Sequence, residues 1–534
     1  MSQLTLDRAD ARILVADPIA EDGVERLRSA GTVDVRTGLS GAELVAIIGA
    51  YDALVVRSET RVSAEVLDAA RRLRVVGRAG VGVDNIDIDA ATRHGVMVLN
   101  APTGNTIAAA EHAVALMCAL VRNVAAADAS LKGGRWDRNA FMGSELREKT
   151  LGLLGLGKIG SEVARAASLG LLMRVIAHDP MVAPERAEQA GAELVDFDTL
   201  LREADVLSVH VPLTDTTRGC IGAAELAAMR PGARVINVAR GGIIDEAALA
   251  AALASGHLAG AAVDVFTTEP VPAGNPLLAA PNTLLTPHLG ASTLEAQVNV
   301  AYDVADQIAA VLAGGVARYA VNAPAILPEE LAALRPYMEL AERMGALARQ
   351  LVGGRLRRVS CTYSGELAAG ETIVLTAEAL RGILAPYTET RINPINARAV
   401  ARQRGIALEE RSATATHDFA NTMVLEVTGA ERITLAGTQF EGQARITRID
   451  EYRVTMAPHG RYLVATNQDR RGVIAAVSTL LAECGINIAG IELSRDQPYG
   501  RALMLLETDE EVGEAVLERL RGLGVLETLR AVAL

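Results

Sequence analysis

The sequence predicts an α/β chain with two doubly wound domains, followed by two smaller units that mix strands and helices. Two observations predict this class. From Arg12 to His288, short apolar runs alternate with helix-length patterns, which is typical of parallel sheets that helices cover on both faces. From Arg461 to Leu534, the order is strand, helix, strand, strand, helix, strand, which is that of a ferredoxin-like unit.

Composition supports several cores that are built from aliphatic side chains. Of the 534 residues, 50% are hydrophobic but only 3% are aromatic, so we expect cores of Ala, Val, Leu and Ile. At about 150 residues per domain, this length indicates three or four domains.

Charge and cysteine usage exclude several classes of protein. A formal net charge of −13 with few aromatic residues makes nucleic acid an unsuitable partner. The four cysteines lie far apart, so we expect reduced thiols, no disulfide and no metal site. Charges interrupt the apolar region near the N-terminus, and no apolar run approaches about 18 residues. We therefore expect a cytoplasmic protein without a signal peptide or a membrane partner.

The pattern places the domain boundaries as follows. Residues 1–103 form the first parallel-sheet domain, and a long Ala-rich helix opens a second one over residues 104–293. The long helical pattern within residues 294–322 is expected to return the chain to the first domain, which makes the second domain an insertion. A cleft would then lie between the two lobes. Residues 323–457 form a third unit with mixed signals, and residues 458–534 form the last unit.

A glycine-rich turn predicts the ligand of the second domain. Gly155, Gly157 and Gly160 follow an apolar run and open a helical pattern. The first glycine permits the tight turn, the second lets a pyrophosphate approach the backbone, and the third lets the helix pack on the strand. The next apolar run ends at Asp179, whose carboxylate can bind a ribose diol and repels a 2′-phosphate. This arrangement predicts a Rossmann-like domain that binds NAD rather than NADP.

Polar residues end three further strand-like runs of this domain, at the sheet edge where ligands bind. Arg240 ends ARVINVAR, Glu269 follows GAAVDVFTT, and His288 ends TLLTPH. A carboxylate beside a histidine fixes the imidazole tautomer and raises its pKa, while arginine grips a carboxylate with two hydrogen bonds. Together they suit oxidation of an anionic alcohol by hydride transfer. The other histidines, His112 among them, are expected to be structural or on the surface.

Five longer stretches carry a resemblance to a known family. They are ARGGIIDEAAL from Ala239, DVFTTEP from Asp264, PHLGAST from Pro287, GRAGVGVDN from Gly77 and NAPTGNTIAAAEHA from Asn100. The first three resemble signatures of the D-isomer-specific 2-hydroxyacid dehydrogenases. The last two narrow the resemblance to the D-3-phosphoglycerate dehydrogenase branch, and the two C-terminal units resemble the long form of that branch.

The resemblance implies roles for individual residues. His288 would be the acid–base group and Glu269 its partner, while Arg240 would bind the carboxylate and the C2 oxygen of the substrate. Asp264 would lie near the nicotinamide. The other positions that the resemblance carries over are Lys158, Ile159, Ala239 and Gly290 on the cofactor side, and Arg57, Arg78 and Asn105 on the substrate side. Which of the two arginines on the substrate side binds the phosphate stays open.

The implied reaction is the NAD-dependent oxidation of 3-phosphoglycerate to 3-phosphooxypyruvate, the first step of phosphorylated L-serine biosynthesis. The resemblance also implies a homotetramer. The last unit resembles an ACT domain, in which Asp469 and Asn487 match serine-binding positions between two such domains. Feedback inhibition by L-serine is therefore implied. Asn467 and Arg471 depart from the residues that are common in the family, and a dimerisation module without an effector is the alternative.

The third unit resembles the intervening domain of the long-form enzymes, which implies a site for the substrate or another anion. Its stretch RINPINARAVARQRG contributes four arginines either to such a site or to a solvated helix face. They are Arg391, Arg398, Arg402 and Arg404.

Two other functions compete with this reading. One is a different 2-hydroxyacid dehydrogenase, such as a glyoxylate or hydroxypyruvate reductase, but those enzymes usually lack an amino-acid-sensing tail. The other is a non-catalytic NAD-sensing protein of the same fold, similar to transcriptional corepressors. Such a sensor would not need Arg240, Glu269 and His288 together.

Overall fold

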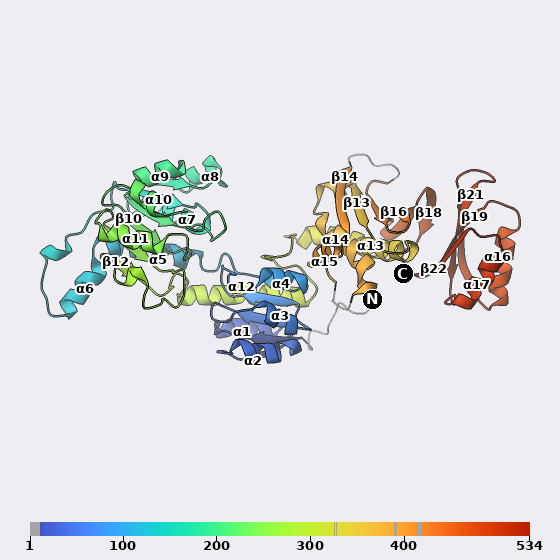
Figure 1. Cartoon of the computed structure of the whole chain (residues 1–534), viewed down its shortest axis with the longest axis horizontal. Helices are drawn as coiled ribbons and strands as arrows, with labels where there is room; N and C mark the ends of the chain where they lie inside the picture. Colours follow the sequence, from blue (N-terminus) through green and yellow to red (C-terminus); the bar gives the residue numbers. More distant parts are fainter. Residues whose placement is uncertain (1–10, 325, 327, 389–391, 414–418) are drawn as a thin grey trace.

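The structure, a computed structural model, describes residues 11–324, 326, 328–388, 392–413 and 419–534. It contains four sheets, one in each of four lobes of an elongated molecule. The second lobe along the chain lies at one end, the first lobe lies next to it, and the third and fourth lobes follow (Figure 1). The predicted fold class is confirmed: two parallel-sheet lobes precede a mixed lobe and a βαββαβ lobe.

The first lobe is a five-stranded parallel sheet with the strand order β2-β1-β3-β4-β5. Its strands are short. The central strand β3 is buried at every position, as expected for a sheet covered on both faces, whereas the edge strand β2 is partly exposed. The strands are β1 (Arg12–Val15), β2 (Thr32–Val35), β3 (Ala53–Val56), β4 (Val75–Arg78) and β5 (Met97–Leu99); the helices are α1 (Glu21–Arg28), α2 (Gly41–Ile47), α3 (Ala64–Ala69) and α4 (Ile88–Arg93).

Helix α12 (Leu294–Leu312) returns the chain to this first lobe. Its side chains Val304 and Ile308 lie so close to Gly77 of β4 that a Cβ at Gly77 would collide with them. Beyond α12, the Asn322 amide exchanges hydrogen bonds with the backbone beside β5: its Nδ2 donates to the carbonyl of Val96 at 2.9 Å, and its Oδ1 accepts from the N–H of Val98 at 2.9 Å. The second lobe is thus inserted into the first.

The second lobe holds a seven-stranded parallel sheet with the order β12-β11-β10-β9-β6-β7-β8. The apolar runs of the sequence form β6, β7, β9, β10, β11 and β12, and the two-residue β8 is an addition. The strands are β6 (Thr150–Leu154), β7 (Arg174–His178), β8 (Glu193–Leu194), β9 (Val206–Val209), β10 (Arg234–Asn237), β11 (Gly260–Val263) and β12 (Thr283–Leu285); the helices are α5 (Thr106–Val121), α6 (Val124–Lys132), α7 (Lys158–Arg165), α8 (Pro184–Gln189), α9 (Phe197–Glu203), α10 (Ala223–Ala228) and α11 (Glu246–Ala254).

The Ala-rich helix that opens this lobe is interrupted. Asn123 adopts a left-handed conformation with φ 54°, which ends α5 and starts α6 in a new direction. Helix α6 projects from the body of the lobe (Figure 1). In the described part of the chain, no single helix is long and apolar enough to cross a membrane, and α5 and α6 pass that test only as a pair bent by 62°.

One buried cluster joins the third and fourth lobes, and the other face of the fourth sheet has a core of its own. The third sheet has the order β14-β13-β15-β16-β17-β18, and the fourth has β20-β21-β19-β22. Val464, Leu505 and Val532 of the fourth sheet belong to the same buried cluster as the third lobe's core. The strands are β13 (Arg358–Ser364), β14 (Ala407–Ala413), β15 (Thr422–Thr428), β16 (Arg432–Phe440), β17 (Gln443–Ile449), β18 (Tyr452–Met456), β19 (Arg461–Gln468), β20 (Ile488–Arg495), β21 (Arg501–Thr508) and β22 (Thr528–Ala533); the helices are α13 (Pro328–Leu351), α14 (Ile373–Leu384), α15 (Ala397–Gln403), α16 (Val473–Glu483) and α17 (Glu514–Gly522).

Helices α13 and α14 touch backbone to backbone through two glycines. A Cβ at Gly345 would collide with the carbonyl of Ala379, and a Cβ at Gly382 would collide with the carbonyl of Glu342.

We expect Gly382→Ala to lower the melting temperature of the C-terminal half in scanning calorimetry. Overpacking costs about 1–3 kcal/mol, which exceeds the gain of about 1 kcal/mol that alanine brings to a helix. Gly522→Ala in α17 is the matched control, because a Cβ there meets no atom within 4 Å. Equal melting temperatures for the two variants would contradict the proposed contact.

Candidate active site

The glycine turn between β6 and α7 has the geometry that a dinucleotide needs. Gly155 has φ 95°, and a Cβ there would lie 2.8 Å from the carbonyl oxygen of His210. A Cβ at Gly160 would collide with the carbonyl of Gly155, so the start of α7 packs directly on the turn. At Gly157 nothing lies within 4 Å of a Cβ, which leaves open space before the helix N-terminus for a pyrophosphate.

Asp179, just beyond the end of β7, is fixed beside this turn. Its Oδ2 accepts a hydrogen bond from the backbone N–H of Leu156 at 2.9 Å, and its Oδ1 accepts one from that of Met181 at 2.9 Å. Each carboxylate oxygen keeps a further lone pair for a ribose hydroxyl. The predicted ribose acid and the predicted phosphate loop therefore lie together.

The other predicted positions of the loop differ in what they contact. The Lys158 ammonium lies over the ring of Tyr319, 5.5 Å from its centroid, so it reaches the chain that follows α12. Ile159 is partly buried against the core of the second lobe. A side-chain contact from Ile159 to a cofactor is therefore not evident, and the backbone of the loop is what faces the open space.

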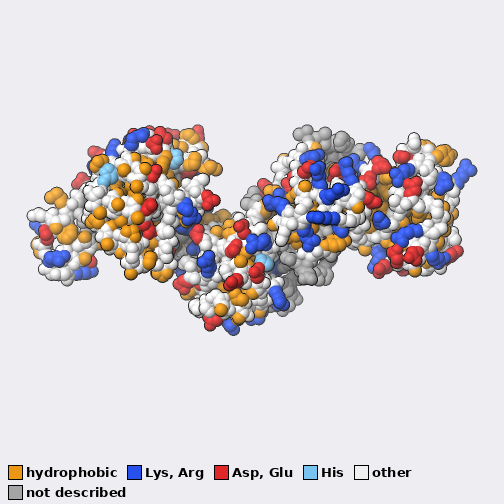
Figure 2. Space-filling view, in the orientation of Figure 1, with side chains coloured by type: hydrophobic (Ala, Val, Ile, Leu, Met, Phe, Trp, Pro, Cys, Tyr) orange, Lys and Arg blue, Asp and Glu red, His pale blue; other side chains and the backbone are white. Residues whose placement is uncertain are grey.

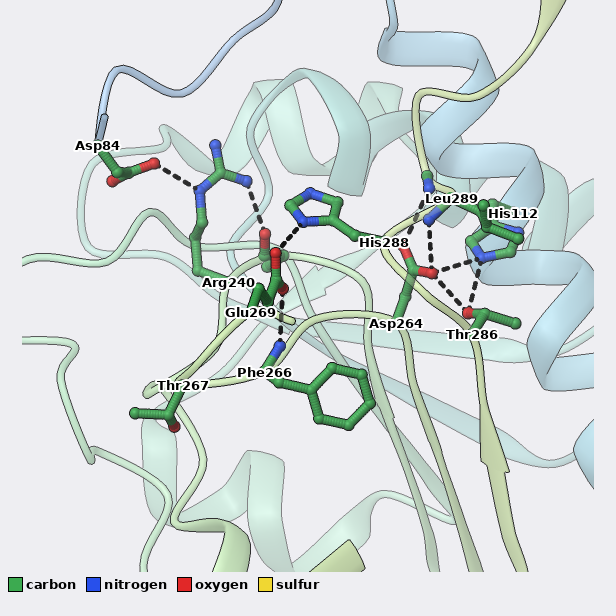
Figure 3. Close-up of polar contacts among 12 residues, drawn as sticks. Asp84, His112, Arg240, Asp264, Phe266, Thr267, Glu269, Thr286, His288 and Leu289 are labelled. Atoms are coloured by element: carbon green, nitrogen blue, oxygen red, sulfur yellow. Dashed lines mark hydrogen bonds and ion pairs between the residues drawn. The ribbon is translucent and has the colours of Figure 1, made fainter. Parts of the chain in front are cut away.

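His288 and Glu269 form the predicted pair (Figure 3). The imidazole Nδ1 lies 2.7 Å from Glu269 Oε2, and Glu269 Oε1 accepts from the backbone N–H of Phe266 at 2.9 Å. Burial raises the pKa of Glu269, but the hydrogen bonds from His288 and Phe266 outweigh it and the net pKa is lowered. Because an ionised carboxylate only accepts, Nδ1 carries the proton and Nε2 is free to accept one.

A left-handed backbone aims this imidazole. His288 has φ 56°, which is uncommon for a residue with a side chain. Its backbone N–H donates to the carbonyl of Asp264 at 2.8 Å and holds the turn at the end of β12.

Asp264 is fully buried behind this turn and accepts hydrogen bonds at both oxygens. Oδ1 receives the Thr286 hydroxyl at 2.5 Å and the Leu289 N–H at 2.8 Å, and Oδ2 receives the Gly290 N–H at 2.9 Å. Burial raises its pKa, but the hydrogen bonds, with that of His112 first, outweigh burial and lower it.

His112 is a residue that the sequence reasoning left among structural or surface histidines. Its Nε2 lies 3.2 Å from Asp264 Oδ1 and 3.3 Å from Thr286 Oγ1 (Figure 3). It reaches the site from α5, far from the strand ends in sequence. The AEHA motif was the only signal that could have found it.

Arg240 connects the two lobes. Its Nη1 donates to the carbonyl of Ala239 at 2.7 Å, and its Nε donates to Asp84 Oδ2 at 3.2 Å (Figure 3). Asp84 follows β4 of the first lobe, so this ion pair joins the first lobe to the second. Ala239 itself is anchored by its N–H to Asn237 Oδ1 at 3.1 Å.

The predicted substrate-side residues lie on the first lobe and at the start of α5. Burial lowers the pKa of Arg78 to about 10, and its Nε has no hydrogen-bond partner within the described ranges of the chain. The Arg57 guanidinium contacts the carbonyl of Pro18 at 3.4 Å. Asn105 precedes α5, and its buried Oδ1 is also without a partner among the described residues. Unpaired buried polar atoms of this kind are rare, and they fit a site that a polar ligand completes.

The predicted effector residues are not brought together within one chain. Asp469 follows β19 and pairs with Arg495 at 3.0 Å, whereas Asn487 precedes β20 and its Nδ2 donates to Asp509 at 2.6 Å. Since β19 and β20 both pair antiparallel with β21, these two residues lie at opposite ends of the sheet.

The arginine-rich stretch of the third lobe does not gather its side chains either. Arg391 lies outside the described residues. Arg398 pairs with Glu410, and Arg404 donates to the carbonyl of Tyr387 at 2.9 Å, while Arg402 is exposed on α15.

Comparison with known proteins identifies the lobes. Residues 114–290 match the family model of the D-isomer specific 2-hydroxyacid dehydrogenase NAD binding domain. Residues 333–450 match the D-3-phosphoglycerate dehydrogenase intervening domain, and residues 461–525 match the ACT domain.

Relatives match over nearly the whole chain. D-3-phosphoglycerate dehydrogenase of Archaeoglobus fulgidus is 46% identical over 97% of this chain and 99% of its own length. That of Bacillus subtilis is 39% identical over 98% of this chain and 99% of its own. Among solved structures, the TT0316 protein from Thermus thermophilus has a TM-score of 0.54 and 36% identity, and it matches 58% of this chain and 99% of its own. By this likeness over its whole length, the chain belongs to the D-3-phosphoglycerate dehydrogenase family.

Proposed function

We propose that this chain oxidises 3-phosphoglycerate to 3-phosphooxypyruvate with NAD, as the first step of phosphorylated L-serine biosynthesis. The observation that carries the proposal is the His288–Glu269 pair, which stands at the carboxyl edge of an NAD-binding sheet with Arg240 nearby. A solved glyoxylate reductase is 32% identical to this chain but matches only 59% of it. A simple reductase would leave the intervening and ACT lobes without a role.

His288 is the general base of the proposed reaction. Its Nε2 accepts the proton of the C2 hydroxyl, because Nδ1 is committed to Glu269. The low pKa of Glu269 keeps that carboxylate ionised, which stabilises the imidazolium that forms. NAD supplies the acceptor for the C2 hydride when it is bound.

Arg240 offsets the negative charge on the substrate's carboxylate and on the C2 oxygen. Arg57 and Arg78 supply further positive charge on the first lobe for the phosphate. Asp264 holds the turn from Leu289 to Gly290 through two backbone N–H groups, so it positions the segment that carries His288 for hydride transfer to NAD when NAD is bound.

We also propose that L-serine inhibits the enzyme by binding between ACT lobes of two subunits in a homotetramer. Asp469 and Asn487 support this arrangement, because one sheet places them at opposite ends and only two sheets side by side can bring such residues to one ligand. Asp469 would pair with the ammonium of serine in place of Arg495.

The test of both proposals is one assay. Purified protein is mixed with NAD and 3-phosphoglycerate, the product is trapped, and reduced cofactor is followed with and without L-serine. We expect turnover that serine suppresses. If turnover did not change with serine, the proposed inhibition would be wrong, but the proposed oxidation of 3-phosphoglycerate would stand. Reduction of glyoxylate or hydroxypyruvate, without oxidation of 3-phosphoglycerate, would contradict the substrate assignment.

His288→Gln is expected to lower kcat by about 10²–10⁴-fold, because glutamine cannot take the hydroxyl proton. NAD binding, measured by calorimetry, should stay within twofold of the wild type. His257→Gln is the matched control: His257 lies before β11, at the opposite edge of the same sheet, and its Nε2 is 3.1 Å from the carbonyl of Leu226. A fully active His288→Gln variant would show that another group is the base.

Asp179→Ser is expected to lower kcat/KM for NAD by about 10–100-fold, because a hydrogen bond to a charged group contributes about 1.5–3 kcal/mol. The same change removes the repulsion of a 2′-phosphate, so kcat/KM for NADP should rise relative to that for NAD. Asp198→Ser, on the exposed first turn of α9, is the control. An unchanged ratio of the two cofactors would rule out Asp179 as the ribose ligand.

A further inference from the structure

Arg78 and Arg240 both pack against one short loop of the first lobe, residues 80–84. A Cβ at Gly80 would collide with Nη1 of Arg78, and a Cβ at Gly82 would collide with Nη2 of Arg240. Both guanidinium groups therefore rest on the bare backbone of this loop. Asp84 ends the loop, and its carboxylate offsets the positive charge of both arginines.

The contacts of Arg240 show which of its donors are taken. Nη1 donates to its neighbour's carbonyl, that of Ala239, and Nη2 packs against Gly82. The edge formed by Nε and Nη2 is the one that can grip a carboxylate with two hydrogen bonds. Asp84 Oδ2 lies 3.2 Å from Nε and is already on this edge.

Asp84 also offsets the positive charge of three neighbouring arginines, Arg57, Arg78 and Arg240. Burial is the main cause of the low pKa of Arg78, the positive charges of Arg240 and Arg57 lower it further, and Asp84 and Asp17 oppose them. The carboxylate of Asp17 is already engaged within the first lobe, where it accepts a hydrogen bond from the Thr60 N–H at 3.1 Å. Among the described residues, Asp84 is the only ion-pair partner of Arg240.

The bond between Asp84 and Arg240 is a weak one. The side chain of Asp84 is 66% exposed against 28% for Arg240, and a single nitrogen–oxygen contact joins them. Exposed pairs of this kind contribute little, so a ligand that brings more contacts can replace the carboxylate.

We propose that Asp84 is a specificity-determining residue that occupies the place of the substrate's carboxylate on Arg240 until the substrate displaces it. This inference rests on the proposed function, in which Arg240 binds that carboxylate. A simple monocarboxylate gains only one anchor and competes poorly with Asp84. A 2-hydroxyacid that also carries a phosphate gains a second anchor on the arginines of the first lobe and displaces it.

The test compares Asp84→Asn with the wild type and measures KM and kcat for 3-phosphoglycerate, together with the inhibition constant of acetate, which is a carboxylate without a phosphate. We expect KM to fall about two- to fivefold and the inhibition constant of acetate to fall at least as much. The effect on kcat should be smaller than that on KM, and both gains should shrink at high ionic strength.

Two variants provide the controls. Asp89→Asn removes the same charge from exposed surface five residues further on and should leave all three constants unchanged. Asp84→Glu keeps the carboxylate and should restore KM and the inhibition constant toward the wild-type values. Thermal melting of each variant checks that the fold is intact.

A rise of KM in Asp84→Asn, with acetate binding unchanged or weaker, would overturn the proposal, because Asp84 would then orient Arg240 for the substrate. No change in either constant would overturn it too. If the wild type did not oxidise 3-phosphoglycerate, calorimetry of acetate binding to the NAD-loaded protein would still compare the two chains. Failure of the proposed function and failure of this inference are therefore distinguishable.

Discussion

The arrangement of the candidate active site depends on one buried carboxylate, that of Asp264. Asp264 has no exposed surface, and a charge in that position is tolerated only when hydrogen bonds satisfy it. Its partners come from three places in the fold: His112 on α5, Thr286 after β12, and the backbone of residues 289–290. Because the N–H groups of residues 289–290 must donate to Asp264, the turn that carries His288 is fixed in place. The geometry of the His288–Glu269 pair is thus a consequence of satisfying the buried anion behind it.

Charge also connects the first and second lobes. Besides the two segments of chain that pass between them, the contacts that join them include Arg240 with Asp84 and Lys158 with Tyr319. Each involves a cation from the cofactor lobe, and each cation stands where an anionic ligand is expected. The same side chains can therefore hold the lobes together in the free enzyme and bind ligand once it arrives.

The sequence predicted those parts of the site that lie close together along the chain. The spacing of Gly155 to Asp179 reflects one strand–turn–helix–strand unit, so its geometry is local. Arg240 and His288 were found because each follows the end of a strand of this parallel sheet, and such strand ends meet at one edge. Asp84 and His112 could not be found in this way, because each reaches the site from a different element and only the assembled fold brings it there. The two-residue β8 has too little pattern to predict, and the break at Asn123 needs a backbone angle that composition does not reveal.

The buried cluster that joins the last two lobes has a consequence for how this architecture can change over evolution. One face of the ACT sheet, with Val464 and Leu505, is sealed by the third lobe. Deleting the ACT segment would uncover the apolar surface of the third lobe that it covers, and exposed patches of this kind promote aggregation. The ACT lobe is therefore not a detachable appendage. A descendant that did not use an amino-acid effector would retain this lobe as a scaffold, or lose both lobes together.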